Sequence, residues 1–364
     1  MKIFYIANIK LPTEKAHGYQ IVKMCEEFGK KIEVELIIPG RKSHIKDDVF
    51  EYYDVKENFK IRRLGSFDFF KWEKVLGKLA WIIQRVLLSW AVGGLDMKEG
   101  DVVYTREEEV VWVMAKKSKR VVYEAHNWPN RVKTHIKMIR GAYKIICITK
   151  GLAEKYIESG LEKEKILIAP DGVDLEKFDI KKTKREIREE LDLPVDKKIV
   201  IYVGSFQKWK GVNTLIEVAK RIEDVLFILV GGVGELGEAL KNVKAVGQKP
   251  KREIPKWMAV ADVLVLPNSG KENISKFYTS PLKMFEYMAS GVPIVASDLP
   301  SIMEVLNEEN AVLVEADNVG NLAMGIEKVL EDENFGERLA DKAKEDSKKY
   351  GWDKRVENIL KFIK

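Results

Sequence analysis

Short apolar segments that alternate with helical segments are the feature that most limits what this chain can fold into. Residues 2–7 (KIFYIA) read as a strand that leads through a loop to a helix from about Tyr19. Residues 198–204 (KIVIYVG) begin the same order again, before a helix from about Asn213. Repeated strands, loops and helices are typical of doubly wound, mostly parallel sheets. Because the 364 residues exceed one ordinary domain, we expect an α/β protein with two such domains.

The turn-rich residues 170–174 (PDGVD) mark the passage between the two halves, and they place the domain boundary near 172–180. We predict an N-terminal domain over residues 1–175 and a C-terminal domain over 176–349. The last residues, 350–364, are predicted to form a helix that packs back on the N-terminal domain.

Residues 280–298 (SPLKMFEYMASGVPIVASD) read as an amphipathic helix followed by a buried strand. Ser280 suits the N-cap, Pro281 suits the first helical position, and Gly291 suits the left-handed geometry that ends a helix. The free N–H groups and positive dipole of such a helix start suit a phosphate. Farther along, Glu286 is placed to accept hydrogen bonds from two ribose hydroxyls, or it is a solvated side chain on an exposed face.

Other candidates follow the carboxyl ends of predicted strands, where ligands bind in doubly wound sheets. Lys210 lies near a helix start after the strand at 198–204 and can neutralise a diphosphate, or it is one solvated lysine among many. His126 follows the strand at 120–124 and is a candidate for catalysis or donor contact, although a single histidine is more often structural. Gly18 lies late in the first loop, where a ligand would bind.

Gly232, Gly234 and Gly237 match the GxGxxG pattern of dinucleotide-binding proteins. We discount a nicotinamide cofactor, because the helix that follows is short. In addition, Gln248 follows the next strand, where an acidic residue would hold the ribose. The sequence contains neither a DxD pair nor a His/Cys cluster, so we predict no metal site.

Five blocks resemble, in order and spacing, the family 4 retaining glycosyltransferases, which belong to the glycosyl transferases of group 1. These blocks are 123–129 (YEAHNWP), 148–178, 202–219 (YVGSFQKWKGVNTLIEVA), 261–267 (ADVLVLP) and 280–305. The resemblance covers nearly the whole chain and implies the GT-B fold, in which two Rossmann-like domains with parallel sheets face each other across a cleft. It also implies a retaining hexosyltransferase that moves a sugar from a UDP- or GDP-linked donor to an acceptor hydroxyl, without a metal or a permanently bound cofactor.

The resemblance also implies residue roles. Glu286 corresponds to the second Glu of an E-x7-E motif, which holds the donor ribose. Lys210 matches the Lys that accompanies the diphosphate, and His126 matches a His that contacts the donor sugar. Lys210, His126 and Glu286 are thus the predicted catalytic residues. The predicted nucleotide-binding residues are Gly18, Ser205, Gly232, Gln248, Ser280, Pro281, Leu282 and Glu286.

Two positions depart from the family pattern. The first Glu of the motif falls on Tyr278, and the family's Arg after the strand-end glycine falls on Ser205. One cation that faces the leaving diphosphate is therefore missing, and Lys208, Arg252 and Lys271 are candidates to replace it. Two other functions stay open, namely a nucleotide-sugar epimerase and a weakly active protein that binds sugar nucleotides or glycans.

Residues 66–94 hold six Phe and Trp residues around the apolar run LAWIIQRVLLSWAVGG, which is too short for a full bilayer span. The run reads either as a buried core helix or as a helix whose aromatic face lies in a membrane interface. Residues 1–175 also carry 32 Lys and Arg against 25 Asp and Glu. From these features we predict that the acceptor is a sugar or a lipid-linked molecule and that residues 66–94 make a peripheral contact with a membrane. We predict no nucleic-acid partner.

The first nine residues lack a basic leader and a cleavage site, and Cys25 and Cys147 lack the spacing of a disulfide framework or a metal cluster. We therefore expect a cytoplasmic protein, with any membrane contact at the inner face.

Overall fold

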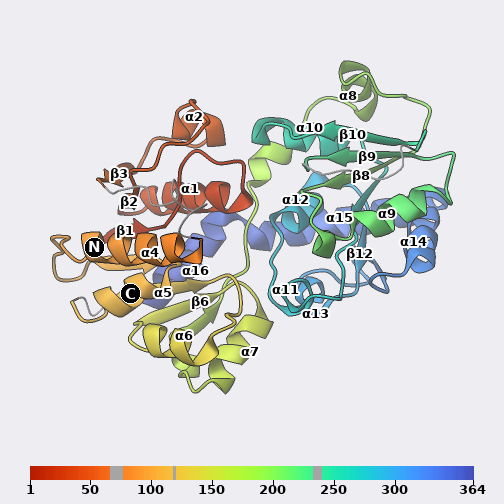
Figure 1. The fold of residues 1–364 in the computed structure, drawn as a ribbon. Helices are drawn as coiled ribbons and strands as arrows, with labels where there is room; N and C mark the ends of the chain where they lie inside the picture. The colour runs from red at the N-terminus through yellow and green to blue at the C-terminus, as the bar shows by residue number, and fades with distance from the viewer. Residues whose placement is uncertain (66–76, 118–119, 233–239) are drawn as a thin grey trace. The chain divides into compact units, whose positions relative to one another are not determined.

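The computed structural model describes residues 1–65, 77–117, 120–232 and 240–364. By contact density the chain divides into two units. The first unit contains Met1–Ala169 together with Arg355–Lys364, and the second contains Pro170–Lys354. Each unit is a parallel sheet flanked by helices (Figure 1).

The first unit is built on a seven-stranded sheet in the order β3-β2-β1-β4-β5-β6-β7, and every pairing in it is parallel. Its inner strands are buried on both faces, which is why they read as continuous apolar runs. The strands are β1 (Lys2–Ile6), β2 (Glu33–Pro39), β3 (Lys60–Leu64), β4 (Val102–Thr105), β5 (Val121–Ala125), β6 (Lys144–Cys147) and β7 (Ile166–Ile168). The helices are α1 (Ala16–Gly29), α2 (Val49–Tyr53), α4 (Lys78–Val92), α5 (Glu108–Met114), α6 (Val132–Ile139), α7 (Lys150–Glu158) and the 3-10 turn η2 (Lys163–Lys165).

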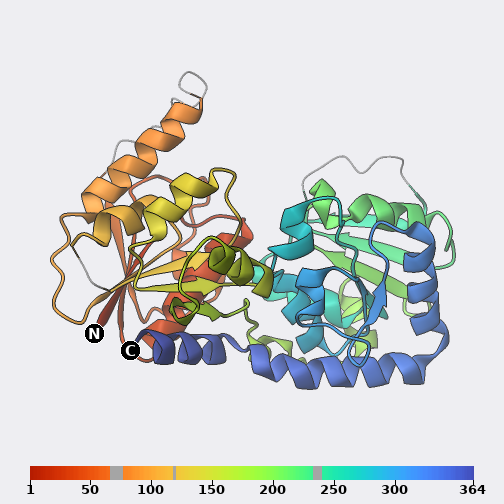
Figure 2. The ribbon, with the colours of Figure 1, turned by 90° about the horizontal axis from the view of Figure 1, so that it is seen from below.

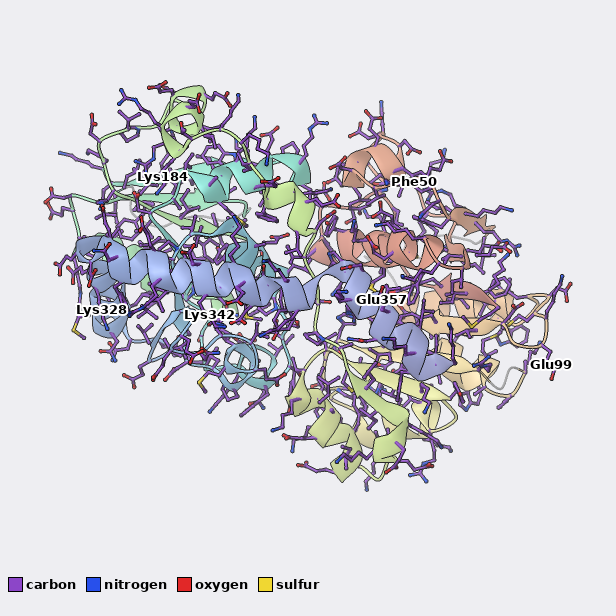
Figure 3. The ribbon with its side chains drawn as sticks, turned by 180° about the vertical axis from the view of Figure 1, so that it is seen from behind. Phe50, Glu99, Lys184, Lys328, Lys342 and Glu357 are labelled. Carbon is purple, nitrogen blue, oxygen red and sulfur yellow. The ribbon has the colours of Figure 1, made fainter. Side chains whose placement is uncertain are left out.

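The end of the last helix, α16 (Trp352–Ile363), belongs to the first unit from Arg355 onward. Glu357, labelled in Figure 3, pairs with Lys31 of the loop after α1 at 3.0 Å. Arg355 donates to the carbonyl of Ala169 at 3.2 Å and to Glu124 of β5 at 3.2 Å. These bonds attach the last ten residues of the chain to the sheet formed by its first half.

The second unit is built on a six-stranded parallel sheet in the order β10-β9-β8-β11-β12-β13. Its strands are β8 (Ile199–Val203), β9 (Leu226–Val230), β10 (Val243–Gly247), β11 (Val263–Leu266), β12 (Ile294–Ser297) and β13 (Val312–Val314). Its helices are α8 (Lys184–Glu190), α9 (Val212–Ala219), α10 (Ile254–Ala259), α11 (Asn273–Phe277), α12 (Leu282–Ser290), α13 (Pro300–Met303), α14 (Val319–Glu331) and α15 (Glu333–Ser347). The short 3-10 turns are η3 (Leu175–Phe178), η4 (Lys208–Lys210), η5 (Lys251–Glu253) and η6 (Lys348–Tyr350).

The second sheet has an apolar core on each face. Ile199, Ile201 and Val203 of β8 pack in a cluster with α10 and α12, whereas Val200 and Tyr202 pack in another cluster with α9 and α14. This alternation is the two-residue period of a strand that is buried on both sides. The predicted α/β class, with two Rossmann-like parallel sheets, is confirmed.

The polar segment 267–279, which shows no clear helical pattern in the sequence, contains the short helix α11. Helix propensity is weak over so short a stretch, and tertiary packing decides it: α11 packs on α13, and Ser301 Oγ donates to the carbonyl of Ser275 at 2.7 Å.

Helix α4, which Figure 2 shows in orange projecting from the first unit, has buried and exposed side chains over residues 86–92. Leu88 and Val92 are buried, but Val86, Leu87 and Trp90 are exposed, with Trp90 at 78%. The reading of a fully buried core helix is therefore wrong for this part of the chain. Phe67, Phe69, Phe70 and Trp72 lie outside the described residues. Within the described ranges, no helix is long and apolar enough to span a bilayer.

Candidate functional site

The N-terminus of α12 carries no side-chain cap. The predicted cap, Ser280, is wrong by one position: Pro281 is the N-cap and Leu282 the first helical residue. The buried Ser280 Oγ accepts a hydrogen bond from the backbone N–H of Asp171 at 3.0 Å, so it holds the segment after β7 instead of the helix. The first amides of α12 therefore lack a side-chain acceptor, and their positive dipole end is open to an anion.

Lys210 lies beside the carboxyl end of β8. Gly204 follows that strand with φ +145°, and Tyr202 Oη donates to the carbonyl of Ser205 at 2.8 Å, which fixes the turn. Lys210 Nζ donates to Ser205 Oγ at 2.8 Å. Burial lowers the pKa of Lys210, because no carboxylate compensates its loss of water. Lys210 thus lies next to Ser205 at the end of β8.

Lys283 is a site residue that the sequence reasoning missed. Its side chain is buried, and its Nζ has no hydrogen-bond partner among the described residues. Nζ lies 3.9 Å from the centroid of the Tyr202 ring, and a Cβ placed on Gly204 would be 3.6 Å from it. Burial, and after it the charge of Lys210, lower the pKa of Lys283 well below its usual range. The sequence did contain a signal that could have identified Lys283: it is a cation in the first turn of an apolar helix, where the helix dipole disfavours positive charge.

Glu286 is buried one turn after Lys283 on the same helix. Lys251 of η5 donates from its Nζ to Glu286 Oε1, and its side chain is 26% exposed. The reading of Glu286 as a solvated residue on an exposed face is therefore wrong. The carboxylate is held inside the unit by a lysine that has access to water.

Glycines allow backbones to approach closely around these side chains. Gly211, with φ +71°, caps the start of α9, and a Cβ there would lie 1.6 Å from the carbonyl oxygen of Pro267. Gly232, with φ +72°, follows β9, and a Cβ there would meet the Phe206 ring at 2.6 Å. Gln248 is exposed directly after β10. Gly234 and Gly237 of the GxGxxG pattern lie outside the described residues.

The candidates to replace the missing arginine differ in burial from Lys283. Lys208, Arg252 and Lys271 all have exposed side chains. Tyr278, which stands in place of the first Glu of the E-x7-E motif, is buried after α11. Lys283 is therefore the buried cation that lies next to Lys210 at the end of β8.

In the first unit, His126 directly follows β5 and is half-buried. Its Nε2 lies 2.5 Å from Glu124 Oε1, and Glu124 also receives hydrogen bonds from Arg106 at 3.0 Å, Arg355 at 3.2 Å and Tyr104. Burial by itself would raise the pKa of Glu124, but Arg106, Arg355 and His126 together hold it well below its usual range. An ionised carboxylate thus fixes the imidazole of His126 at the strand end.

Gly18 lies in the first turn of α1, not in the loop where the sequence placed it. A Cβ at this position would be 2.3 Å from Tyr53 Oη and 2.5 Å from Thr13 Cγ2. Tyr53 Oη in turn donates to the carbonyl of Thr13 at 2.8 Å. The glycine is therefore explained by the close packing of α1 on this loop.

Among the residues that the structure describes, no group of three or more His, Cys, Asp or Glu is placed to hold a metal ion. Cys25 and Cys147 are both buried and free.

Residues 183–346 match the family described as Glycosyl transferases group 1. The chain is 25% identical over 251 residues to a D-inositol 3-phosphate glycosyltransferase of Xylanimonas cellulosilytica, and the match covers 63% of this chain and 58% of the relative. It is 22% identical over 346 residues to the putative teichuronic acid biosynthesis glycosyltransferase TuaC of Bacillus subtilis, with 89% and 84% covered. The match thus spans less than two thirds of the first relative.

The fold is similar to that of HepE from Anabaena, solved in complex with UDP-glucose. The two chains superpose with a TM-score of 0.76 over 99% of this chain and 98% of HepE, at 18% sequence identity. The match over residues 183–346 confirms the predicted resemblance to the glycosyl transferases of group 1. Membership of the narrower family 4 stays a prediction.

Proposed function

We propose that this chain, whose residues 183–346 carry the domain of the group 1 glycosyl transferases, is a retaining hexosyltransferase that uses a UDP- or GDP-linked sugar. The observation that carries the proposal lies within the second unit. The buried Lys283, the half-buried Lys210 and the uncapped start of α12 lie at the end of β8, and Glu286 follows one turn along the same helix. Clustered cations and free amides suit a diphosphate, and a buried carboxylate suits the hydroxyls of a ribose.

In the proposed reaction, the bond between the anomeric carbon and the diphosphate oxygen breaks while the acceptor oxygen bonds the same face of that carbon. The acceptor proton passes to an oxygen of the leaving phosphate. Lys210 and the amides near Pro281 and Leu282 stabilise the negative charge that builds on the leaving group. Lysines and amides supply the positive charge in this scheme, so the reaction requires no metal ion.

Apart from Gly18, which close packing explains, the other predicted positions are proposed to support the site. Ser280 holds the backbone of Asp171 beside the helix start, and Gly232 and Gln248 follow strands that end near β8, where a nucleotide would bind. His126 is proposed to contact the transferred sugar, supported by its place at a strand end and by the ionised Glu124 that orients it.

For the acceptor, we propose a sugar or lipid-linked hydroxyl, reached by a cytoplasmic enzyme with peripheral contact to the inner face of a membrane through residues 66–94. The exposed Val86, Leu87 and Trp90 of α4 support this contact. Co-sedimentation with anionic liposomes at low salt tests it. We expect binding that Leu87→Glu with Trp90→Glu reduces at least tenfold, and a chain that stays in the supernatant contradicts the proposal.

A panel of nucleotide sugars tests the donor, because a ligand that binds only the folded state raises Tm by mass action. We expect one UDP- or GDP-sugar to stabilise the protein, and NMR of the product formed with an acceptor panel to show retained anomeric configuration. Release of an epimerised sugar nucleotide without any acceptor would show an epimerase instead. Binding without turnover across the panel would leave a sugar-nucleotide-binding protein.

A further inference from the structure

We propose that Lys283 and Lys210 together form the diphosphate-binding site of this protein, and that Lys283 supplies the cation that is missing at Ser205. The inference rests on the proposed function, but it concerns a residue that the comparison with relatives does not assign.

The ammonium group of Lys283 lies at the end of β8. Its Nζ is 3.6 Å from where a side chain on Gly204 would begin, and Gly204 is the residue directly before Ser205. Lys210 Nζ bonds the hydroxyl of Ser205 at 2.8 Å. Two ammonium groups, one from η4 and one from α12, thus lie at the same strand end.

No acidic or carbonyl oxygen among the described residues compensates the charge of Lys283. Its Nζ is buried, and it contacts the Tyr202 ring but bonds no oxygen among the described residues. The one acidic neighbour on the same helix face, Glu286, is taken by Lys251. A buried Lys283 that bonds no oxygen and a half-buried Lys210 that bonds a neutral hydroxyl, both near the positive end of a helix dipole, are unfavourable without an anion. An arriving diphosphate removes that penalty.

The protonation of Lys283 responds to an anion. Lys210 and the Tyr202 ring face Lys283, and the acidic neighbour on its own helix, Glu286, is paired with Lys251. Burial, and after it the charge of Lys210, lower the pKa of Lys283 well below its usual range, and a bound dianion raises it again. Diphosphate binding should thus take up a proton, in contrast to binding by an exposed lysine.

Calorimetric titration of the full chain with inorganic pyrophosphate, UDP and UMP tests the proposal. We expect Lys283→Met to weaken pyrophosphate and UDP about 10- to 100-fold and UMP much less. The matched control, Lys220→Met, removes an exposed lysine that pairs with Glu217 and should change none of these affinities. A second variant, Ser205→Arg combined with Lys283→Met, should recover most of the lost pyrophosphate affinity.

Proton uptake gives a second test. Titration of pyrophosphate in two buffers of different ionisation enthalpy should show more proton uptake by the wild type than by Lys283→Met. Equal pyrophosphate affinity in Lys283→Met and the wild type, or equal proton uptake by both, overturns the inference. Either result leaves the proposed function standing if the protein still transfers sugar. Conversely, pyrophosphate binding that depends on Lys283, in a protein that transfers no sugar, supports the site and refutes the transferase.

Discussion

Glu286→Gln tests whether the buried carboxylate of α12 is kept for the ribose of a nucleotide. Glutamine preserves the shape of the side chain but removes the charge, so that only a neutral carbonyl oxygen remains to accept from the ribose. A hydrogen bond to a charged group contributes about 1.5–3 kcal/mol, which corresponds to about 10- to 150-fold in affinity. We therefore expect UDP or GDP to bind about 10- to 150-fold more weakly to the variant.

Lys251→Met is the matched variant, because it removes the other half of the same ion pair. Breaking a fully buried pair costs about 3–5 kcal/mol, but Lys251 is 26% exposed and water screens its charge, so we expect about 1–3 kcal/mol. At about 2–4 °C per kcal/mol for a unit of this size, its Tm should fall by about 2–12 °C. Nucleotide affinity should hold or rise, because Glu286 no longer has to leave a cation to bind a ribose.

Calorimetric titration at pH 7.5 measures the two affinities, and differential scanning fluorimetry measures Tm. The two variants should separate: Glu286→Gln loses binding with little change in Tm, and Lys251→Met loses stability with little loss of binding. Equal losses of nucleotide affinity in both variants would show that the ion pair itself shapes the site. Unchanged affinity in Glu286→Gln would refute the ribose role altogether.

Three further predictions follow from the charged groups. Lys210→Met should lower kcat at least about 100-fold and nucleotide affinity less than tenfold, because its charge acts most on the leaving diphosphate; steady-state kinetics that show only a KM effect contradict this. Lys283→Met should reduce a rise in Tm as the pH approaches 10.5, because there the unfolded chain still binds a proton that the buried Lys283 has lost; parallel Tm profiles of the variant and the wild type would contradict this. Arg355→Met should destabilise the first unit by about 3–5 kcal/mol, because it leaves the buried Glu124 with one cation fewer. It should also raise the pKa of Glu124, so that the variant unfolds at a higher pH than the wild type when acid is added, as circular dichroism would detect.

Local patterns in the sequence were enough to predict the architecture. A buried strand, a loop and an amphipathic helix are defined by residues within a few positions of one another, and their repetition implies parallel sheets. The same patterns placed Lys210 at a strand end, Glu286 on α12 and Gly291, with φ +69°, at the end of that helix. Short helices such as α11 were missed, because their stability depends on packing and not on their own residues.

Only the tertiary structure decided which partners the polar groups have. Ser280 bonds Asp171, 109 residues away, and Glu286 bonds Lys251, 35 residues away. Lys283 looked like any surface lysine of an amphipathic helix until α12 was packed on β8, where Tyr287 Oη accepts from the N–H of Val203 at 2.8 Å. Periodicity tells which face of an element is buried, but the order of strands in a sheet determines what that face meets. For this reason the sequence alone determined where the helices and strands lie along the chain. Only the packing of α12 on β8 determined that Lys283 is buried beside Lys210.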